Sequence, residues 1–270
     1  MTLAEKILAR ASGREEVSPG ETVLAAVDLA ASSSNAGEVR RLFLAEGGEE
    51  VWDADRIAIV LQQFAADGNG AAHKALRGFA RQQELRHFYD IGRGGACHQV
   101  VSENGHVLPG MLVVGTSRHA TAYGAYGALA LRIGAERMAA VWSSGQLELE
   151  VPRTTRIEVS GTFRPWVGAK DLVLFLAGNL DMFDGCRNIE FNGPAVGAMQ
   201  ISSRLVLTGL GRRMGAVSAF TVVDDALLTH LTRVVGTPLA SSPMWAPDPD
   251  ASYEQVVPFD VNAELPEPQV

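Results

Sequence analysis

Two patterns of apolar positions alternate along the chain. Residues 71–86 carry Ala75, Leu76, Phe79 and Ala80 at the spacing of one face of an amphipathic helix. Short apolar runs bounded by glycine or polar turns, as at residues 56–61, are typical of buried strands. The interleaving of such runs with helical segments predicts an α/β protein.

The first residues carry the signals of a helix start. Residues 3–11 are predicted to be helical, with Thr2 as the N-cap, Glu5 at capping-box spacing and Gly13 at the end. Further helices are predicted at residues 38–46, 71–86, 120–141, 168–180, 202–214 and 224–235. Strands are predicted at residues 21–30, 56–61, 111–114, 189–191, 217–223 and 253–261, and at one or two positions around Pro152 within 147–160. Ser202 and Ser203 are candidate N-caps.

Composition narrows the class of protein. The 270 residues, 47% hydrophobic and 20% charged, are ordinary for one large or two small globular domains. The net charge of -8 argues against general binding to nucleic acids or anionic membranes, although a local basic pocket remains compatible with it. No apolar run reaches the length of a membrane span, and the N-terminus has charges where a signal peptide needs an apolar stretch. We therefore expect a cytoplasmic protein.

Two histidines stand at turns where α/β proteins carry their sites. His98 follows a glycine-rich loop at 92–95, and His119 follows the apolar run 111–114 and the turn 115–118. The segment after His119 is predicted to be a helix, which places His119 at a strand-to-helix turn. Open α/β sheets bind ligands beyond the carboxyl ends of their strands. These histidines are thus candidates for the functional site, although both could equally persist for packing.

A series of segments in fixed order resembles the aconitase superfamily, and most closely the large subunit of isopropylmalate dehydratase. They are VWDADRIAIV at 51–60, GRGGACHQV at 92–100, VLPGMLVVGT at 107–116, YGAYGALALRIGAERMAAV at 123–141, AKDLVLFLAGNL at 169–180 and IEFNGPAV at 189–196. The resemblance covers most of the chain, to the family segment just before the iron–sulfur-ligand domain. It implies three-layer α/β/α domains with mixed or parallel sheets. We place a first domain at 1–145, carrying the histidines, and a second at 146–270.

The cysteine count bears on the family's cofactor. The resemblance implies a four-iron cluster held by three cysteine thiolates in a later domain, and such clusters need several cysteine ligands. This chain has only Cys97 and Cys186, without a C-x-x-C pair. We therefore expect no iron–sulfur cluster and no other metal on this chain alone. Cys97 beside His98 could be a nucleophile–base pair, but the family commonly has cysteine there without that role. Cys186 is expected to be buried and inert.

Several positions depart from the family's acid–base residues. Ser33 and Ser34 stand where the resemblance implies a His-Asp pair, and Gln62 and Gln63 stand where it implies Asp-His. Glutamine cannot exchange a proton near neutral pH. Either these positions no longer take part in proton transfer, or their two amides remain to bind a substrate carboxylate or carbonyl.

Both retained histidines lose the carboxylate partners that the resemblance implies. Ser117 replaces an aspartate next to the histidine at 98, Arg118 replaces a serine, and Arg213 replaces the glutamate paired with the histidine at 119. A carboxylate raises the pKa of imidazole, whereas a guanidinium lowers it. We expect both rings to be neutral more often, which suits a general base. Arginines that bind carboxylates would line the same pocket. His73, His87 and His106 are interpreted as ordinary helix or surface residues.

Two classes of function follow. The first is a cluster-independent lyase or isomerase of specialised biosynthesis that acts on a small carboxylate-bearing metabolite by elimination or hydration, isomerisation or cyclisation. His98 and His119 would be its acid–base residues, with Arg118, Gln62, Gln63, Ser117 and Arg213 binding substrate. The second is a non-catalytic or partial subunit whose partner supplies the missing domain. A homodimer is compatible with either, and an exposed apolar face would favour the second.

Overall fold

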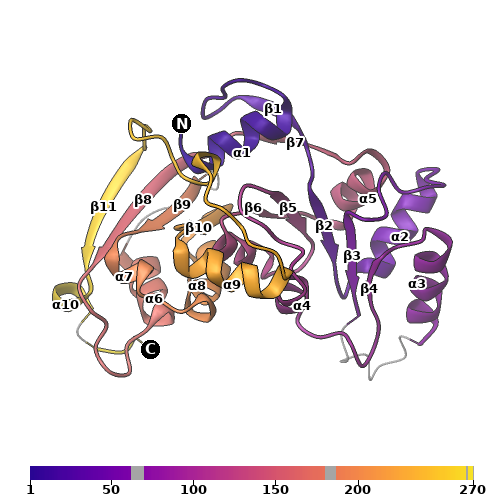
Figure 1. Cartoon of the computed structure of the whole chain (residues 1–270). Coiled ribbons are helices and arrows are strands. Elements are labelled where there is room, and N and C mark those ends of the chain that lie inside the picture. Colours follow the sequence, from indigo (N-terminus) through magenta and orange to yellow (C-terminus); the bar gives the residue numbers. More distant parts are fainter. Residues whose placement is uncertain (62–69, 180–186, 266, 270) are drawn as a thin grey trace.

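Five parallel strands form the larger of two parallel sheets, in the order β4-β3-β2-β5-β6 (Figure 1). The structure is a computed structural model that describes residues 1–61, 70–179, 187–265 and 267–269. The strands are β2 (Leu29–Ser32), β3 (Ile57–Val60), β4 (His87–Tyr89), β5 (Leu112–Gly115) and β6 (Leu129–Arg132). The chain moves outward from β2 through β3 to β4, and then restarts with β5 on the other side of β2. The strand order therefore reverses between β2 and β5.

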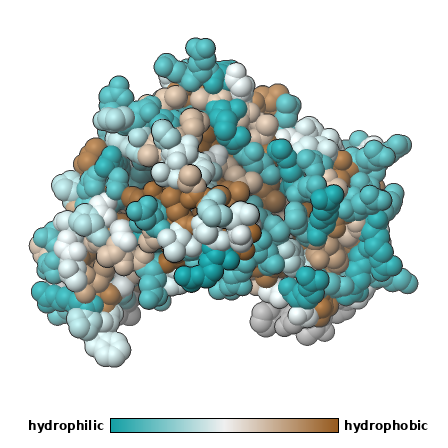
Figure 2. All heavy atoms as spheres, in the orientation of Figure 1, coloured by the Kyte–Doolittle hydropathy of each residue, from teal (hydrophilic) through white to brown (hydrophobic). Residues whose placement is uncertain are grey.

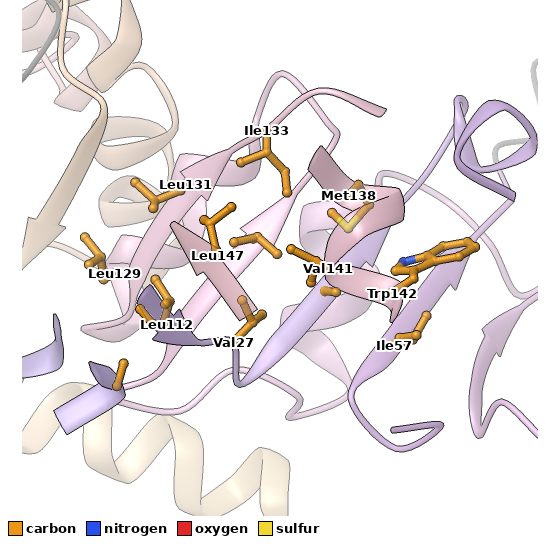
Figure 3. Close-up of a cluster of buried hydrophobic side chains, with 14 of the residues drawn as sticks. Val27, Ile57, Leu112, Leu129, Leu131, Ile133, Met138, Val141, Trp142 and Leu147 are labelled. Carbon is orange, nitrogen blue, oxygen red and sulfur yellow. The ribbon is translucent and has the colours of Figure 1, made fainter. Parts of the chain in front are cut away.

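Helices cover both faces of this sheet, because successive side chains of each strand point to opposite sides. Ile57 and Ile59 pack in one apolar cluster with α2 (Ala36–Ala45), α3 (Gly70–Gln82) and α5 (Ala135–Ser144), part of which is drawn in Figure 3. Ala58 and Val60 pack in another with α4 (Cys97–Glu103), the 3-10 helix η1 (Ala120–Tyr126) and α9 (Asp225–Val235). All four of these strand residues are fully buried. The predicted three-layer α/β/α arrangement is confirmed here.

The second sheet has four parallel strands in the order β10-β9-β8-β11. They are β8 (Arg153–Ser160), β9 (Arg187–Asn192), β10 (Ser218–Thr221) and β11 (Gln255–Asp260). The apolar face, with Ile157 and Phe191, packs against α6 (Ala169–Asn179), α7 (Pro194–Gly197) and α8 (Ile201–Gly209). The opposite face is polar and carries Arg156, Glu158 and Glu190, of which Glu190 accepts hydrogen bonds from the Leu3 amide and the Tyr253 hydroxyl.

The two sheets meet through their edge strands β6 and β10. The Ala130 amide of β6 donates to the Ser218 hydroxyl of β10 at 3.3 Å. An antiparallel ribbon of β1 (Thr22–Ala26) and β7 (Gln146–Glu150) also joins the two halves of the chain, beside α1 (Leu3–Ser12). The larger sheet lies before the predicted domain boundary at 145/146 and the second sheet after it, while the ribbon pairs across it. The boundary itself stays a prediction.

Local signals in the sequence placed several elements correctly. Thr2 and Glu5 form a capping box at the start of α1, and Gly13 ends the helix in the left-handed conformation. The interruption at Pro152 separates β7 from β8, as predicted.

Other elements differ from the predictions. The single helix expected over 120–141 is wrong, because the segment forms η1, β6 and α5, with Gly127 in the left-handed conformation ending η1. The strand expected at 21–30 is two strands, β1 and β2. The helix expected at 202–214 is α8 followed by the short 3-10 helix η2 (Gly211–Met214), and its N-cap is Gln200 rather than either serine.

The C-terminal region adds small elements. The stretch 238–252 is irregular apart from the 3-10 turn η3 (Pro243–Trp245), and β11 is followed by α10 (Val261–Glu264). Among the described residues, every helix is too short or too polar to cross a membrane.

Candidate active site

The reversal between β2 and β5 brings two strand ends together at one edge of the larger sheet. Ser33 follows β2, and its amide donates to the Thr116 hydroxyl after β5 at 3.4 Å. The Thr116 amide donates in turn to the Ala31 carbonyl of β2 at 3.1 Å. A crevice beyond the carboxyl ends of the strands at such a reversal is where open α/β sheets bind ligands.

The turn after β5 positions His119. The His119 amide donates to the Ser117 hydroxyl at 3.3 Å, and η1 begins at Ala120 with His119 as its N-cap residue. Gly115 ends the strand, and a Cβ atom added to it would lie 2.7 Å from the Cβ of Ala120. The absence of a side chain at this position therefore lets η1 start directly against the strand end.

The glycine-rich loop after β4 positions His98. A Cβ atom added to Gly94 would lie 2.0 Å from the Leu61 carbonyl oxygen, so only glycine lets the loop cross the end of β3 this closely. The loop then leads into α4, whose second residue is His98. The Ser102 hydroxyl donates to the His98 carbonyl at 2.7 Å within this helix.

The two histidine rings lie side by side, with ring centroids 5.3 Å apart and planes inclined at 47°. Burial lowers the pKa of His98, and the neighbouring charge of His119 lowers it further. Partial burial also lowers the pKa of His119, although the residue is exposed overall. Both rings are therefore held towards the neutral form by burial and by neighbouring positive charge.

Two guanidinium groups add positive charge at His119. The charges of Arg118 and Arg213 both lower the pKa of His119, because they repel its protonated form. Arg118 comes from the β5 turn, whereas Arg213 comes from η2 beside the second sheet. Both are exposed, and within the described chain neither has an Asp or Glu at salt-bridge distance. The site thus combines neutral imidazoles with arginines available to an anion.

The other predicted site residues have different outcomes. Ser117 bonds to the backbone of His119, and its hydroxyl makes no hydrogen bond to His98 in the structure. Gln62 and Gln63 lie outside the described residues, as does Cys186. Cys97 is buried, and burial raises the pKa of its thiol to about 11, so it is held protonated rather than as the thiolate a nucleophile needs.

Three further histidines are less ordinary than the sequence indicated. His73 was expected on the solvated side of its helix, but it is buried on α3. The rings of His87 and His106 lie 4.0 Å apart, and the Tyr89 hydroxyl hydrogen-bonds His106. Burial, with the charge of His87, lowers the pKa of His106 to about 4. The sequence gives no local signal for this pair, because its members come from β4 and the loop after α4.

The described residues do not fit an iron–sulfur cluster. Among them, no group of three or more His, Cys, Asp or Glu side chains is placed to hold a metal ion. The described cysteine, Cys97, is a protonated thiol whose sulfur lies 3.8 Å from the Tyr123 hydroxyl in a closed apolar layer. A cluster ligand must be an accessible thiolate.

Comparison with known families agrees with this architecture. The family model for aconitase (aconitate hydratase) matches residues 52–268, which include both histidine loops, the second sheet and every strand of the larger sheet except β2. The chain belongs to the aconitase family.

Individual relatives of this aconitase-family chain are dehydratase subunits. It is 40% identical over 276 residues to the probable 3-isopropylmalate dehydratase large subunit of Methanothermobacter thermautotrophicus. It is 41% identical over 275 residues to 3-isopropylmalate dehydratase large subunit 1 of Methanopyrus kandleri. It is 36% identical over 278 residues to the 3-isopropylmalate dehydratase large subunit of Syntrophus aciditrophicus. Each match covers 100% of this chain and 64% of the relative. The chain therefore spans about two thirds of the length of these relatives.

Arg213→Gln is expected to raise the pKa of His119, because it removes a positive charge that disfavours the imidazolium. The pKa can be followed by NMR titration of ring-labelled histidine. Arg212→Gln is a matched control on the same turn, since the charges that act on His119 come from Arg118 and Arg213. An unchanged His119 titration in Arg213→Gln would show that this guanidinium does not reach the ring in solution.

Proposed function

We propose that this aconitase-family chain is a cluster-independent lyase or isomerase of specialised metabolism, acting on a small carboxylate-bearing metabolite. The observation that carries the proposal is the pair of neighbouring rings, His98 and His119, at the strand reversal, with guanidinium charge beside them. The dehydratase names of its relatives favour lyase chemistry.

Arginines suit the binding step in this proposal. Arg118 and Arg213 would hold the substrate carboxylate by charge-assisted hydrogen bonds. Gln62, Gln63 and Ser117 are further proposed contacts from the sequence. A carboxylate bound here would place the carbon next to it within reach of a neutral imidazole.

The histidine pair suits proton transfer. A neutral ring takes the proton from the carbon next to the carboxylate, and the other ring, when protonated, gives its proton to the leaving group on the next carbon or, in an unsaturated acid whose double bond shifts, to the far carbon of that double bond. The pair starts and ends with one proton, so elimination and isomerisation both balance. The lowered pKa values keep the base form available below the ordinary histidine range.

This chemistry can be tested before the leaving group is known. The purified protein would be incubated in D2O with a panel of hydroxylated, unsaturated and β-substituted di- and tricarboxylic acids, with EDTA present. Proton NMR then detects exchange of deuterium into the position next to the carboxylate. We expect exchange with at least one acid, and a fall of about 10²–10⁴-fold in His98→Gln and His119→Gln.

Matched variants distinguish catalysis from folding. His230→Gln changes a histidine on α9 outside the site and is expected to keep the exchange rate. Arg118→Gln is expected to raise the apparent KM more than it lowers the turnover number. Undiminished exchange in both active-site histidine variants would contradict the assignment. If no acid in the panel exchanges, that result favours a chain without proton-transfer activity.

A partial-subunit role is the alternative, and one observation favours it. Figure 2 shows apolar residues gathered in the middle of the face, between α1 and the helices α8 and α9. Relatives named as large subunits make a partner subunit plausible. Size-exclusion chromatography with light scattering, with and without a candidate small subunit, tests this, because a stable complex would be seen as an increase in mass.

A further inference from the structure

A cavity lies where β6, β7 and the second sheet meet. Its volume is about 420 Å³, which is within the range of small-molecule pockets. The β6 side supplies Leu129, Leu131 and Ile133, and β7 supplies Leu147 and Leu149. Figure 3 shows Leu147 beside the β6 leucines, with Ile133 beyond them. The inner wall is therefore aliphatic.

The rim of this cavity carries positive charge. Arg132 at the end of β6 and Arg212 on η2 both line the cavity and are exposed. Within the described chain, neither guanidinium has an Asp or Glu at salt-bridge distance. Arg137 differs, because its guanidinium donates to the Glu148 carbonyl.

The acidic residues of the cavity lie on β7. Glu148 and Glu150 are exposed and alternate along this strand with Leu147 and Leu149. Strand alternation places them on the face opposite Leu147 and Leu149, as it places Arg132 opposite Leu131, so these charged groups lie at the rim, where three arginines outnumber two glutamates. The whole chain has a net charge of -8, yet this cavity combines an apolar wall with two arginines that are available to an anion.

From this combination we infer that the cavity binds a small amphiphilic carboxylate, one with an aliphatic or aryl body of several carbons. The body contacts the leucine wall, and the carboxylate bonds to Arg132 and Arg212. A bound inorganic anion would leave the leucine wall exposed to water. A neutral apolar molecule would leave the two arginines without an anionic partner.

The cavity is separate from the pair of His98 and His119. None of its lining residues is a member of that site. The two are nevertheless neighbours, because Arg132 pairs in register with Gly115 before the His119 turn, and Arg212 precedes Arg213. The inference therefore does not rest on the proposed catalytic function.

Three small molecules distinguish the contribution of the carboxylate to binding from that of the apolar body. Calorimetric titration would compare 3-phenylpropionate with 3-phenylpropionamide, which lacks the charge, and with propionate, which lacks the body. We expect the full acid to bind at least tenfold more tightly than either comparison compound. Equal affinity for acid and amide, or no binding of the acid at millimolar concentration, would overturn the inference.

Variants locate the bound acid. The double variant Arg132→Gln/Arg212→Gln is expected to weaken 3-phenylpropionate at least tenfold. Leu149→Trp enlarges a half-buried wall residue of β7 and is expected to abolish binding by filling the cavity. Thermal unfolding checks that each variant is folded. His98→Gln/His119→Gln is expected to leave the affinity unchanged, and a loss in that variant alone would assign the acid to the histidine pocket and refute a second site.

Discussion

Arg204→Met is expected to lower the free energy of unfolding by about 3–5 kcal/mol, because it leaves partners of a buried charge without a counterpart. Arg204 is fully buried on α8. Its guanidinium donates to both carboxylate oxygens of Asp224, at 3.0 and 2.6 Å. It also donates to three carbonyl oxygens, those of Gly197, Met199 and Val222. Methionine fills similar space and satisfies none of these acceptors.

Urea denaturation followed by circular dichroism measures this loss. Arg212→Met is the matched control, because Arg212 is exposed and is expected to change stability by less than about 0.5 kcal/mol. Adding Asp224→Ser to Arg204→Met removes the orphaned carboxylate and keeps a capping side chain for α9, so part of the loss should return. A loss below about 1 kcal/mol would mean that the network contributes little.

Gly124→Ala is expected to lower the free energy of unfolding by about 3 kcal/mol or more, because the new methyl group would lie in the contact between η1 and β10. A Cβ atom at Gly124 would lie 1.7 Å from the Ala219 carbonyl oxygen of β10. That oxygen belongs to backbone held in the sheet by β9, so η1 or β10 must move.

A second glycine provides the control for this substitution. Gly78 lies inside α3, and a Cβ atom added there meets nothing within 4 Å. Gly78→Ala should therefore stabilise the protein by about 0.5–1 kcal/mol through helix propensity. Thermal melts of both variants give the comparison. If Gly124→Ala has the same melting temperature as the wild type, the close contact between η1 and β10 does not exist in solution.

The sequence predicted best those features that depend on neighbouring residues. The capping box at Thr2 and the break at Pro152 are local chemistry, and both were correct. The helix predicted over 120–141 failed because Leu129 and Leu131 suit a helix by composition, while pairing with β5 selects a strand. That pairing is a tertiary choice, which local pattern cannot reveal.

The candidate site shows the same division. The strand-to-helix turn and the family resemblance indicated His98 and His119, and the resemblance placed Arg213 near His119, where its charge acts. Ser117 was expected beside His98, yet its hydroxyl accepts a hydrogen bond from the backbone amide of His119. The pairing of His87 with His106 had no sequence signal, because it depends on how the loop after α4 returns to β4.

The meeting of η1 with β10 also sets the order of events during synthesis. A seven-residue 3-10 helix is not stable by itself, so η1 depends on its packing against β6 and is completed by the contacts of Gly124 with Ala219 and of Ala122 with Thr208. These partners leave the ribosome about ninety residues later, several seconds at ordinary rates of translation. The strands of the larger sheet can all have emerged while His119 still lacks its final position. A nascent chain stalled before β10 would therefore carry the sheet without the assembled histidine pair.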